Sequence, residues 1–326
     1  MTVDPGALAA ALAELGDLAR LDAPLGARTT YRVGGTAAVL VEVEALADLR
    51  RVAAAVAASG LPTLVVGKGS NLLVADAGFP GIAVALGVGF EAVSLERTTV
   101  VAGGATPLPV LARRTAAAGL TGLEWAVGVP GTVGGGVRMN AGGHGSDMAA
   151  TLTGIHLFDV GTGQHDEVAA ADLALGYRCS AVGLTQVVVD ATFELRLGDP
   201  KRAGEEVAAI VRWRREHQPG GQNAGSVFTN PPGAAAGRLV DEAGCQGLRL
   251  GSAEVSKKHA NFIQADATGS ADDVLALIRL VVHRVEAASG ITLHPEVRLV
   301  GFPPAVDHEA SPAVHHEASP APEVES

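Results

Sequence analysis

The feature that most constrains this chain is a segment of very high glycine density at residues 128–145, GVPGTVGGGVRMNAGGHG. Glycine in regular structure costs about 0.5 to 1 kcal/mol of conformational entropy relative to alanine, so a single turn does not explain such a run. The density indicates backbone that packs closely against a ligand. The polar members of the segment, Thr132 and Asn140, can hydrogen-bond a diphosphate or the edge of a ring.

A second glycine-rich loop, GKGSNLL at residues 67–73, follows the β-branched run 63–66, which is typical of a strand. Its glycines permit positive φ and let backbone N–H groups approach an anion. The spacing matches neither the dinucleotide fingerprint nor a Walker loop, so the loop alone is consistent with a phosphate cradle or with an ordinary turn. Two such loops in one domain favour a ligand of dinucleotide size.

Composition predicts a folded protein of two domains. The length of 326 residues exceeds one typical domain, and 48% of the residues are hydrophobic. The formal net charge of −11 argues against nucleic-acid binding, because contact with a phosphate backbone needs clustered lysine and arginine. Any phosphate is therefore expected to be held locally.

Cysteine content and the N-terminal residues favour the cytoplasm. The two cysteines, Cys179 and Cys245, have no further histidine or cysteine at ligand spacing, so we predict neither a disulfide framework nor a metal site. The first residues lack the basic start and apolar run of a signal peptide, and no apolar stretch reaches the roughly 20 residues that a bilayer needs. We therefore predict a cytoplasmic protein without membrane insertion.

Periodicity and turn signals predict an α+β chain that begins with a βαβ unit. We expect one domain at 1–200 and a second at 201–302, with the boundary between 198 and 203. Residues 303–326 are acidic and rich in proline, and we expect them to be disordered. Helices are predicted over residues 6–20, 45–59, 107–118, 204–217, 235–243 and 270–288, and strands over 39–43, 63–66, 153–158, 186–195, 262–265 and 296–300.

Several motifs beyond the glycine loops follow one another along nearly the whole chain. They are TYRVGG at 30–35, YRCS at 177–180, NAGSVF at 223–228, VSKKHANF at 255–262 and EVR at 296–298. In order and spacing they resemble the UDP-N-acetylenolpyruvoylglucosamine reductase family. The N-terminal half is similar to the FAD domain of the vanillyl-alcohol-oxidase (PCMH) flavoproteins. The resemblance implies a two-part FAD-binding domain and a smaller C-terminal α+β substrate domain.

The resemblance implies NADPH-dependent reduction of UDP-N-acetylglucosamine enolpyruvate to UDP-N-acetylmuramate through FAD, in peptidoglycan synthesis. FAD is then expected between residues 67–72 and 128–135. Related oxidases often tether FAD through a histidine near the first loop, and because this loop has none we predict non-covalent FAD. The residues expected at the cofactor are Tyr31, Gly67, Lys68, Gly69, Ser70, Asn71, Leu72, Gly128, Pro130, Gly131, Thr132, Gly134, Gly135 and Asn140.

By the same resemblance, Arg178, Ser226 and Glu296 carry the reaction. Hydride from the reduced flavin reaches the methylene carbon of the enolpyruvyl group, and negative charge develops on the neighbouring carbon and the carboxylate. Arg178 and Glu296 are expected to stabilise this charge, and Ser226 to give a proton to the α-carbon. Without the family pattern, these residues are more typical of a surface ion pair, a turn and a solvated strand end.

The UDP-sugar is expected to contact Tyr177, Arg214, Asn230 and Arg298. Arginine suits bidentate contact with phosphate. His217 and Thr229 occupy places where the family is expected to have lysine, so the groups that contact the diphosphate are open, and Arg214 or Arg215 can compensate.

Other residues bear on the subtype and on the surroundings of the site. No tyrosine lies between Arg178 and Ser226, so the chain resembles the subtype that lacks a tyrosine-bearing loop over the substrate. His259 either faces the nicotinamide or the substrate, or it is an ordinary buried histidine. Trp125 is expected in the core.

Two further functions remain open on the residues alone. One is a flavin oxidase that reduces oxygen to peroxide, against which the missing tethering histidine and the Ser226 and Glu296 pattern speak. The other is a non-catalytic module that binds a UDP-sugar or a flavin. We predict a monomer whose substrate is UDP-N-acetylglucosamine enolpyruvate and which has no nucleic-acid partner.

Overall fold

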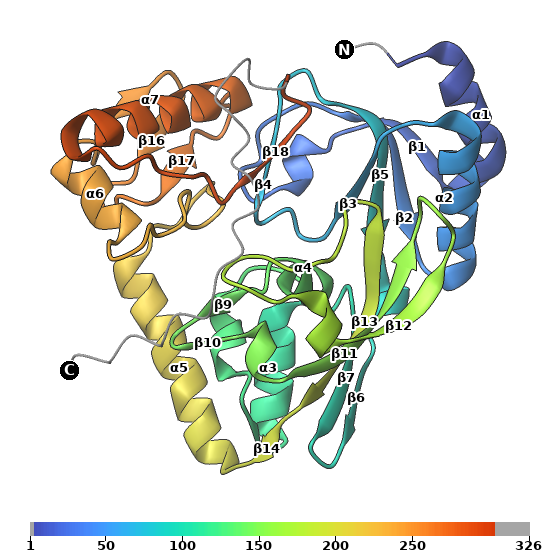
Figure 1. Cartoon of the computed structure of the whole chain (residues 1–326), viewed down its shortest axis with the longest axis horizontal. Coiled ribbons are helices and arrows are strands. Elements are labelled where there is room, and N and C mark those ends of the chain that lie inside the picture. The colour runs from blue at the N-terminus through green and yellow to red at the C-terminus, as the bar shows by residue number, and fades with distance from the viewer. Residues whose placement is uncertain (1–2, 304–326) are drawn as a thin grey trace.

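A four-stranded sheet and two helices form the beginning of the chain. In the computed structural model, which describes residues 3–303, these elements are α1 (Pro5–Leu15), β1 (Ala19–Ala23), β2 (Ala37–Val43), α2 (Leu46–Ser59), β3 (Thr63–Val66) and β5 (Phe79–Leu86). The strand order is β1-β2-β5-β3, and both β2 and β3 pair in parallel with β5. α2 connects β2 to β3 and packs against α1 (Figure 1). The predicted βαβ unit is therefore confirmed.

The predicted helix over residues 6–20 was too long. The helix ends at Leu15, because Gly16 takes a positive φ of 51° and its N–H bonds to the carbonyl of Leu12. A 3₁₀ turn (Gly16–Leu18) follows, and then β1, which pairs antiparallel with β2 so that Ala19 lies opposite Val41. Pairing with a neighbouring strand, which helical spacing cannot predict, decides the structure there.

A five-stranded antiparallel sheet forms the second part of the N-terminal half. Its strands are β6 (Val93–Glu96), β7 (Thr99–Gly103), β11 (Leu152–Asp159), β12 (His165–Ala169) and β13 (Gln186–Glu194), in the order β12-β11-β13-β7-β6. Two helices, α3 (Leu108–Ala117) and α5 (Pro200–His217), pack against each other beside it, and a short pair, β8 (Leu120–Thr121) and β14 (Arg196–Leu197), lies next to them (Figure 1). Leu111, Phe193 and Ile210 belong to their common core.

The glycine-dense segment is more regular than a loop. It contains the last residue of a 3₁₀ turn (Glu124–Gly128), the short helix α4 (Val133–Arg138) and a hairpin of β9 (Gly142–Gly143) and β10 (Ser146–Asp147). The Thr132 hydroxyl accepts the N–H of Gly135 at 3.3 Å and so caps α4. A Cβ on Gly136 would overlap Met148, which means that part of the glycine density serves packing.

The C-terminal part is a small α+β layer in which one long helix covers three short strands. Its elements are α6 (Ala236–Glu242), β15 (Arg249–Leu250), β16 (Ala253–Val255), β17 (Ile263–Ala265), α7 (Ala271–Ser289) and β18 (Arg298–Val300). β18 returns to the N-terminal part and pairs in parallel with β4 (Leu72–Val74), directly after the first glycine loop (Figure 1). This strand pair brings the EVR motif next to that loop.

Hydrophobic packing crosses the predicted boundary between domains. Ile210 of α5 belongs to the core of the five-stranded sheet, while Tyr31 and Leu73 belong to the core of the C-terminal part. The division at residues 198–203 therefore stays a prediction. The α+β fold class is confirmed, and the remaining predicted helices and strands occur within a few residues of their expected ends.

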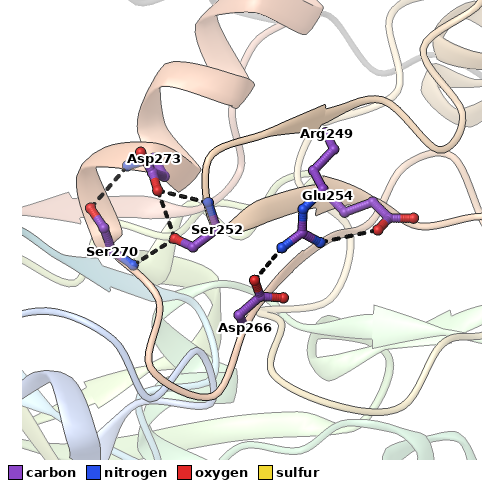
Figure 2. A network of polar contacts seen from close by, with 6 residues as sticks. All are labelled: Arg249, Ser252, Glu254, Asp266, Ser270 and Asp273. Carbon is purple, nitrogen blue, oxygen red and sulfur yellow. Dashed lines mark hydrogen bonds and ion pairs between the residues drawn. The ribbon is translucent and has the colours of Figure 1, made fainter.

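Polar contacts fasten the start of α7 to its surroundings (Figure 2). The Ser270 hydroxyl accepts the N–H groups of Asp272 and Asp273, and the Asp273 carboxylate accepts both the N–H and the hydroxyl of Ser252 at 2.7 Å. Asp76, from the N-terminal part, accepts the Ser270 hydroxyl at 2.6 Å. A carboxylate at a helix N-terminus is favourable, because the first N–H groups lack partners within the helix.

Among the helices described, none is long and apolar enough to cross a membrane. The predicted disordered tail lies outside the described residues except for Pro303.

Candidate functional site

The two glycine segments, far apart in the sequence, meet in space. A Cβ placed on Gly67 would lie 2.8 Å from the Thr132 hydroxyl oxygen, and one on Gly131 would lie 3.5 Å from the Ser70 hydroxyl oxygen. The first loop therefore faces the turn that begins α4. Backbone can approach a ligand closely along this seam, because the glycines carry no side chain there.

The first loop is supported from behind by residues of the TYRVGG region. Gly69 has a φ of 62°, and a Cβ there would lie 2.7 Å from the Cα of Thr29. The N–H of Thr30 donates to the carbonyl of Gly69 at 3.2 Å. Only glycine fits this position, and the contact fixes the loop while Lys68 stays exposed.

Asn71 connects the first loop to the EVR motif. Its side-chain amide donates to the carbonyl of Glu296 at 3.1 Å, and its own carbonyl accepts the N–H of Arg298 at 2.9 Å. Leu72 then begins the parallel pairing with β18. A residue predicted at the cofactor thus also positions a predicted catalytic residue.

Arg178 and Glu296 form an ion pair between the two parts of the chain. Arg178 Nε lies 3.1 Å from Glu296 Oε1, and the two side chains are only 25% and 17% exposed. Arg178 takes a left-handed φ of 57°, which non-glycine residues rarely adopt and which is enriched at functional sites. The sequence predicted both residues for one site, and the fold brings them together.

Burial and neighbouring positive charges have opposite effects on the pKa of the Glu296 carboxyl. Burial raises its pKa, whereas the positive charges of Arg178 and Arg298 lower it, and burial has the larger effect. The pKa is therefore higher than usual despite the adjacent guanidinium. A carboxyl in this state can keep or accept a proton more readily than an exposed glutamate.

The loop that carries Ser226 runs beside Glu296. The N–H of Glu296 donates to the carbonyl of Val227 at 2.7 Å, and a β-bridge joins Phe228 to Pro295. Ser226 itself is half-buried, and Gly225 before it has a φ of 78°. The structure thus places the backbone of Ser226 next to that of Glu296.

Asn261 supports the Ser226 loop and was not among the predicted site residues. It is 4% exposed, its side-chain oxygen accepts the N–H of Phe228 at 2.9 Å, and its amide donates to the Phe228 carbonyl at 2.9 Å. Its own carbonyl accepts the N–H of Val227. The signal that could have identified it is its place in the VSKKHANF motif.

The four residues predicted for the UDP-sugar lie in different environments. Tyr177 is 62% exposed, and the Arg178 guanidinium carbon lies 5.3 Å from its ring centre. Arg298 is exposed and close to Glu296, while Asn230 is exposed and accepts the N–H of Ala236 at the start of α6.

Arg214 reaches from α5 to the second glycine segment. A Cβ on Gly128 would lie 2.9 Å from its Cδ, and burial lowers the pKa of the Arg214 guanidinium. Burial, and then the positive charge of Arg214, lower the pKa of the nearby His144 imidazole. Arg214 forms no ion pair with another described residue.

The two residues expected to replace lysine make local contacts. His217 stacks on Trp213 with ring centres 4.7 Å apart, and its Nδ1 lies 2.8 Å from the Trp213 carbonyl. The Thr229 hydroxyl donates to the carbonyl of His294 at 3.3 Å. Which groups contact the diphosphate therefore stays open.

Two other predicted cofactor residues are buried. Tyr31 is fully buried, burial raises the pKa of its hydroxyl, and that hydroxyl has no hydrogen-bond partner within residues 3–303. Asn140 is 3% exposed, and its side chain bonds to the Gly176 carbonyl, the Asp147 carboxylate and the N–H of Ala149. Contacts of both residues with a cofactor stay predictions.

Trp125 and His259, which the sequence analysis discussed individually, both pack against other protein side chains. Trp125 is 3% exposed in the core of the five-stranded sheet, as predicted. His259 is half-buried, its Nδ1 accepts the N–H of Asn261 at 3.2 Å, and its ring packs against Phe262. These contacts favour the interpretation of His259 as an ordinary buried histidine.

Comparison with known proteins covers nearly the whole described chain. Residues 37–168 match the FAD binding domain family, and residues 217–300 match the C-terminal domain of UDP-N-acetylenolpyruvoylglucosamine reductase. The chain is 43% identical over 300 residues to the UDP-N-acetylenolpyruvoylglucosamine reductase of Synechococcus sp. (strain CC9311), covering 90% of this chain and 96% of that protein. It is 38% identical over 287 residues to that of Rubrobacter xylanophilus, with 87% and 96% covered.

A solved structure agrees with these relatives. The crystal structure of UDP-N-acetylenolpyruvylglucosamine reductase from Thermus caldophilus superposes with a TM-score of 0.76 at 36% identity, covering 86% of this chain and 99% of that one. The likeness in sequence and fold thus extends over both parts of the chain.

Proposed function

Because the chain belongs to the UDP-N-acetylenolpyruvoylglucosamine reductase family, we propose that it reduces UDP-N-acetylglucosamine enolpyruvate to UDP-N-acetylmuramate, with FAD as cofactor and NADPH as reductant. The product is a precursor of peptidoglycan. The observation that carries the proposal for the site is the partly buried Arg178–Glu296 ion pair beside the Ser226 loop.

The seam between the glycine segments fits FAD. Gly67, facing Thr132, leaves room for backbone to lie against a diphosphate. FAD, when bound, supplies the hydride. The first loop contains no histidine, which supports non-covalent binding. Denaturation should then release the yellow colour into the supernatant.

Arg178 and Glu296 act on the negative charge that develops at the substrate. The Arg178 guanidinium stabilises charge at the carboxylate and the adjacent carbon, where a preorganised donor contributes about 3 to 4 kcal/mol in a water-poor site. Glu296, whose pKa is raised by burial, contributes a carboxyl that hydrogen-bonds the substrate carboxylate when protonated. The ion pair between them holds both side chains in place before substrate arrives.

Ser226 gives the proton that completes saturation of the double bond, at the α-carbon. A serine is a weak acid, so it can act only when held close to a basic enolate. The loop supplies that rigidity, because Gly225 takes a positive φ and Asn261 bonds to both polar backbone groups of Phe228. We assign Tyr177, Arg214, Asn230 and Arg298 to the UDP-sugar.

The activity is tested by spectroscopy of the purified protein. NADPH should bleach the flavin, and steady NADPH oxidation should depend on added UDP-N-acetylglucosamine enolpyruvate. An oxygen electrode run in parallel measures any oxidase activity. No turnover with saturating FAD, NADPH and this substrate would rule out the proposed function.

The proposal also includes the location of the enzyme in the cell and its oligomeric state. A cytoplasmic enzyme is consistent with cysteines that are free in the structure, and we propose that it acts as a monomer without a nucleic-acid partner. Light scattering of the FAD-loaded enzyme measures its mass. A stable dimer would contradict the monomer without affecting the proposed reaction.

A further inference from the structure

A groove of about 450 Å³ lies between α3 and α5, two helices that pack side by side (Figure 1). Arg113 of α3 lines one side of it, and the other lining residues all belong to α5. They are Gly204, Val207, Ala208, Val211, Arg212 and Arg215. Residues spaced three and four apart lie on one face of a helix, so α5 presents a continuous face to the groove.

The lining of this groove is positively charged. Arg113, Arg212 and Arg215 are exposed, none of them forms an ion pair within residues 3–303, and no acidic residue lines the groove. Lys258 adds positive charge nearby, because its Nζ donates to the carbonyl of Arg215 at 2.5 Å. A local excess of one charge sign attracts a ligand of the opposite sign.

Between the arginines, the surface of the groove is apolar or has no side chain. Val207 is buried and Val211 half-buried, while Ala208 and Gly204 are exposed. A Cβ on Gly204 would meet no atom within 4 Å, so the groove is open at that end. The groove therefore fits an acidic segment that also carries small apolar residues.

The part of the chain that follows the described residues has this composition. Residues 304–326, here called the C-terminal segment, contain five acidic residues and no lysine or arginine, and they are rich in alanine, valine and proline. Each copy of the HEASPA repeat, at 308–313 and 316–321, places a glutamate next to an alanine. The C-terminal segment thus matches the groove both in charge and in the size of its apolar residues.

The C-terminal segment is also long enough to reach the groove. It begins shortly after β18, and at about 3.3 Å per residue it can span about 75 Å. A globular chain of the length described has a radius of gyration of only about 19 Å. Because the segment is tethered to the same molecule, its effective concentration is of the order of millimolar, so exposed ion pairs that are individually weak can hold it.

We propose that the C-terminal segment binds in the groove between α3 and α5, with its carboxylates against Arg113, Arg212 and Arg215. The inference is independent of the proposed reaction, because it concerns a surface and a segment of the same chain. Arg214, on the same helix, reaches Gly128 and does not line the groove. The segment therefore leaves Arg214 free for the UDP-sugar.

Carbodiimide coupling of the full-length protein tests the proposal, because it joins a carboxylate to an amine in direct contact. Arg212→Lys keeps the positive charge and supplies the amine, and mass spectrometry should find position 212 joined to an acidic residue of the C-terminal segment. Arg50→Lys is the matched control. Arg50 is also an exposed helical arginine without an ion pair within the described residues, and it lies on α2, on the other side of the molecule (Figure 1). It should give at least tenfold less of this product.

Charge should control the yield of the cross-link. In the Arg212→Lys protein, adding Arg113→Glu should lower the yield at least threefold, and so should 1 M salt, which shortens the Debye length to about 3 Å. Circular dichroism checks that each variant is folded. Equal yields at positions 50 and 212, a yield that Arg113→Glu leaves unchanged, or coupling of the segment chiefly to Lys68 would overturn the proposal. Cross-linked dimers in place of monomers would assign the groove to the segment of a second copy and would also overturn it.

Discussion

Two groups of paired arginine and carboxylate side chains in this protein differ in how far they are buried. In the candidate site, the side chains of Arg178 and Glu296 are 25% and 17% exposed, whereas Arg249 contacts Glu254 and Asp266 with 47% of its side chain exposed (Figure 2). Burial raises the pKa of Glu296 in the first cluster, and hydrogen bonding to Asp266 raises the pKa of Arg249 in the second. The same residue types are therefore solvated to different extents in the two places.

This difference indicates that burial determines whether an ion pair can take part in the reaction. Water screens the exposed Arg249 cluster, so its ion pairs contribute little beyond local order. The Arg178–Glu296 pair has lost part of its solvation, so its carboxyl lies nearer the point where it gains a proton. Substitutions should therefore affect turnover in the first cluster and only stability in the second.

The largest effect is expected for Ser226→Ala. Loss of a positioned proton donor should slow reoxidation of the reduced flavin by substrate roughly 10²- to 10⁴-fold. Flavin reduction by NADPH should stay intact, because no proton reaches the α-carbon in that step. Stopped-flow absorbance separates the two half-reactions, and an equal loss in both would contradict the role of Ser226.

Glu296→Gln should have the next largest effect. Glutamine keeps the shape but cannot hold the exchangeable proton or the charge that pairs with Arg178, and we expect product formation to fall roughly 10²- to 10³-fold. Rapid-quench measurement of UDP-N-acetylmuramate checks this. Glu254→Gln, in the exposed cluster, is the matched control, and comparable losses in both variants would refute the contrast between the clusters.

The pH dependence of stability should differ in sign between Glu296 and Asp273. Since burial raises the pKa of Glu296, the wild type should lose stability relative to Glu296→Gln as the pH rises past about 4.3, the ordinary glutamate value. Hydrogen bonds from Ser252 lower the pKa of Asp273, so the stability it contributes at neutral pH should be lost as the pH falls through that lowered pKa. Urea denaturation across pH measures both, with Asp273→Asn as the second variant.

The smallest effect is expected for Arg249→Ala. The cluster is largely exposed, so turnover should stay within about twofold of the unsubstituted enzyme, and the unfolding free energy should fall slightly. Added salt should reduce that difference, because it screens exposed charges. A large loss of turnover at unchanged stability would show that this cluster communicates with the site.

Local patterns predicted most of the fold. The helix expected at 45–59 forms as α2 and ends at Gly60, whose φ of 64° suits a C-terminal glycine. Helical spacing failed after Leu15, where pairing with β2 takes over, and it did not predict α4, whose glycines are poor helix formers. In both places packing against distant residues outweighs local preference.

The sequence predicted which residues belong to the candidate site, but it did not predict how these residues contact one another. Family motifs identified Arg178, Ser226 and Glu296, but the sequence did not indicate that Asn71 bonds to the Glu296 carbonyl or that Asn261 supports the Ser226 loop. These contacts join residues far apart in the chain. The contact of Asn71 adjoins the pairing of β18 with β4, which no local pattern predicts.

By itself the sequence determined the order of elements, the two glycine segments and the set of side chains able to do the chemistry, because periodicity, turn preference and motif order are local properties. Only the tertiary structure decided which of these meet, how Glu296 is desolvated next to Arg178, and where Arg113, Arg212 and Arg215 line a common groove. The physical reason is that burial and electrostatic interaction depend on distances in space, and folding brings together groups that the chain keeps apart.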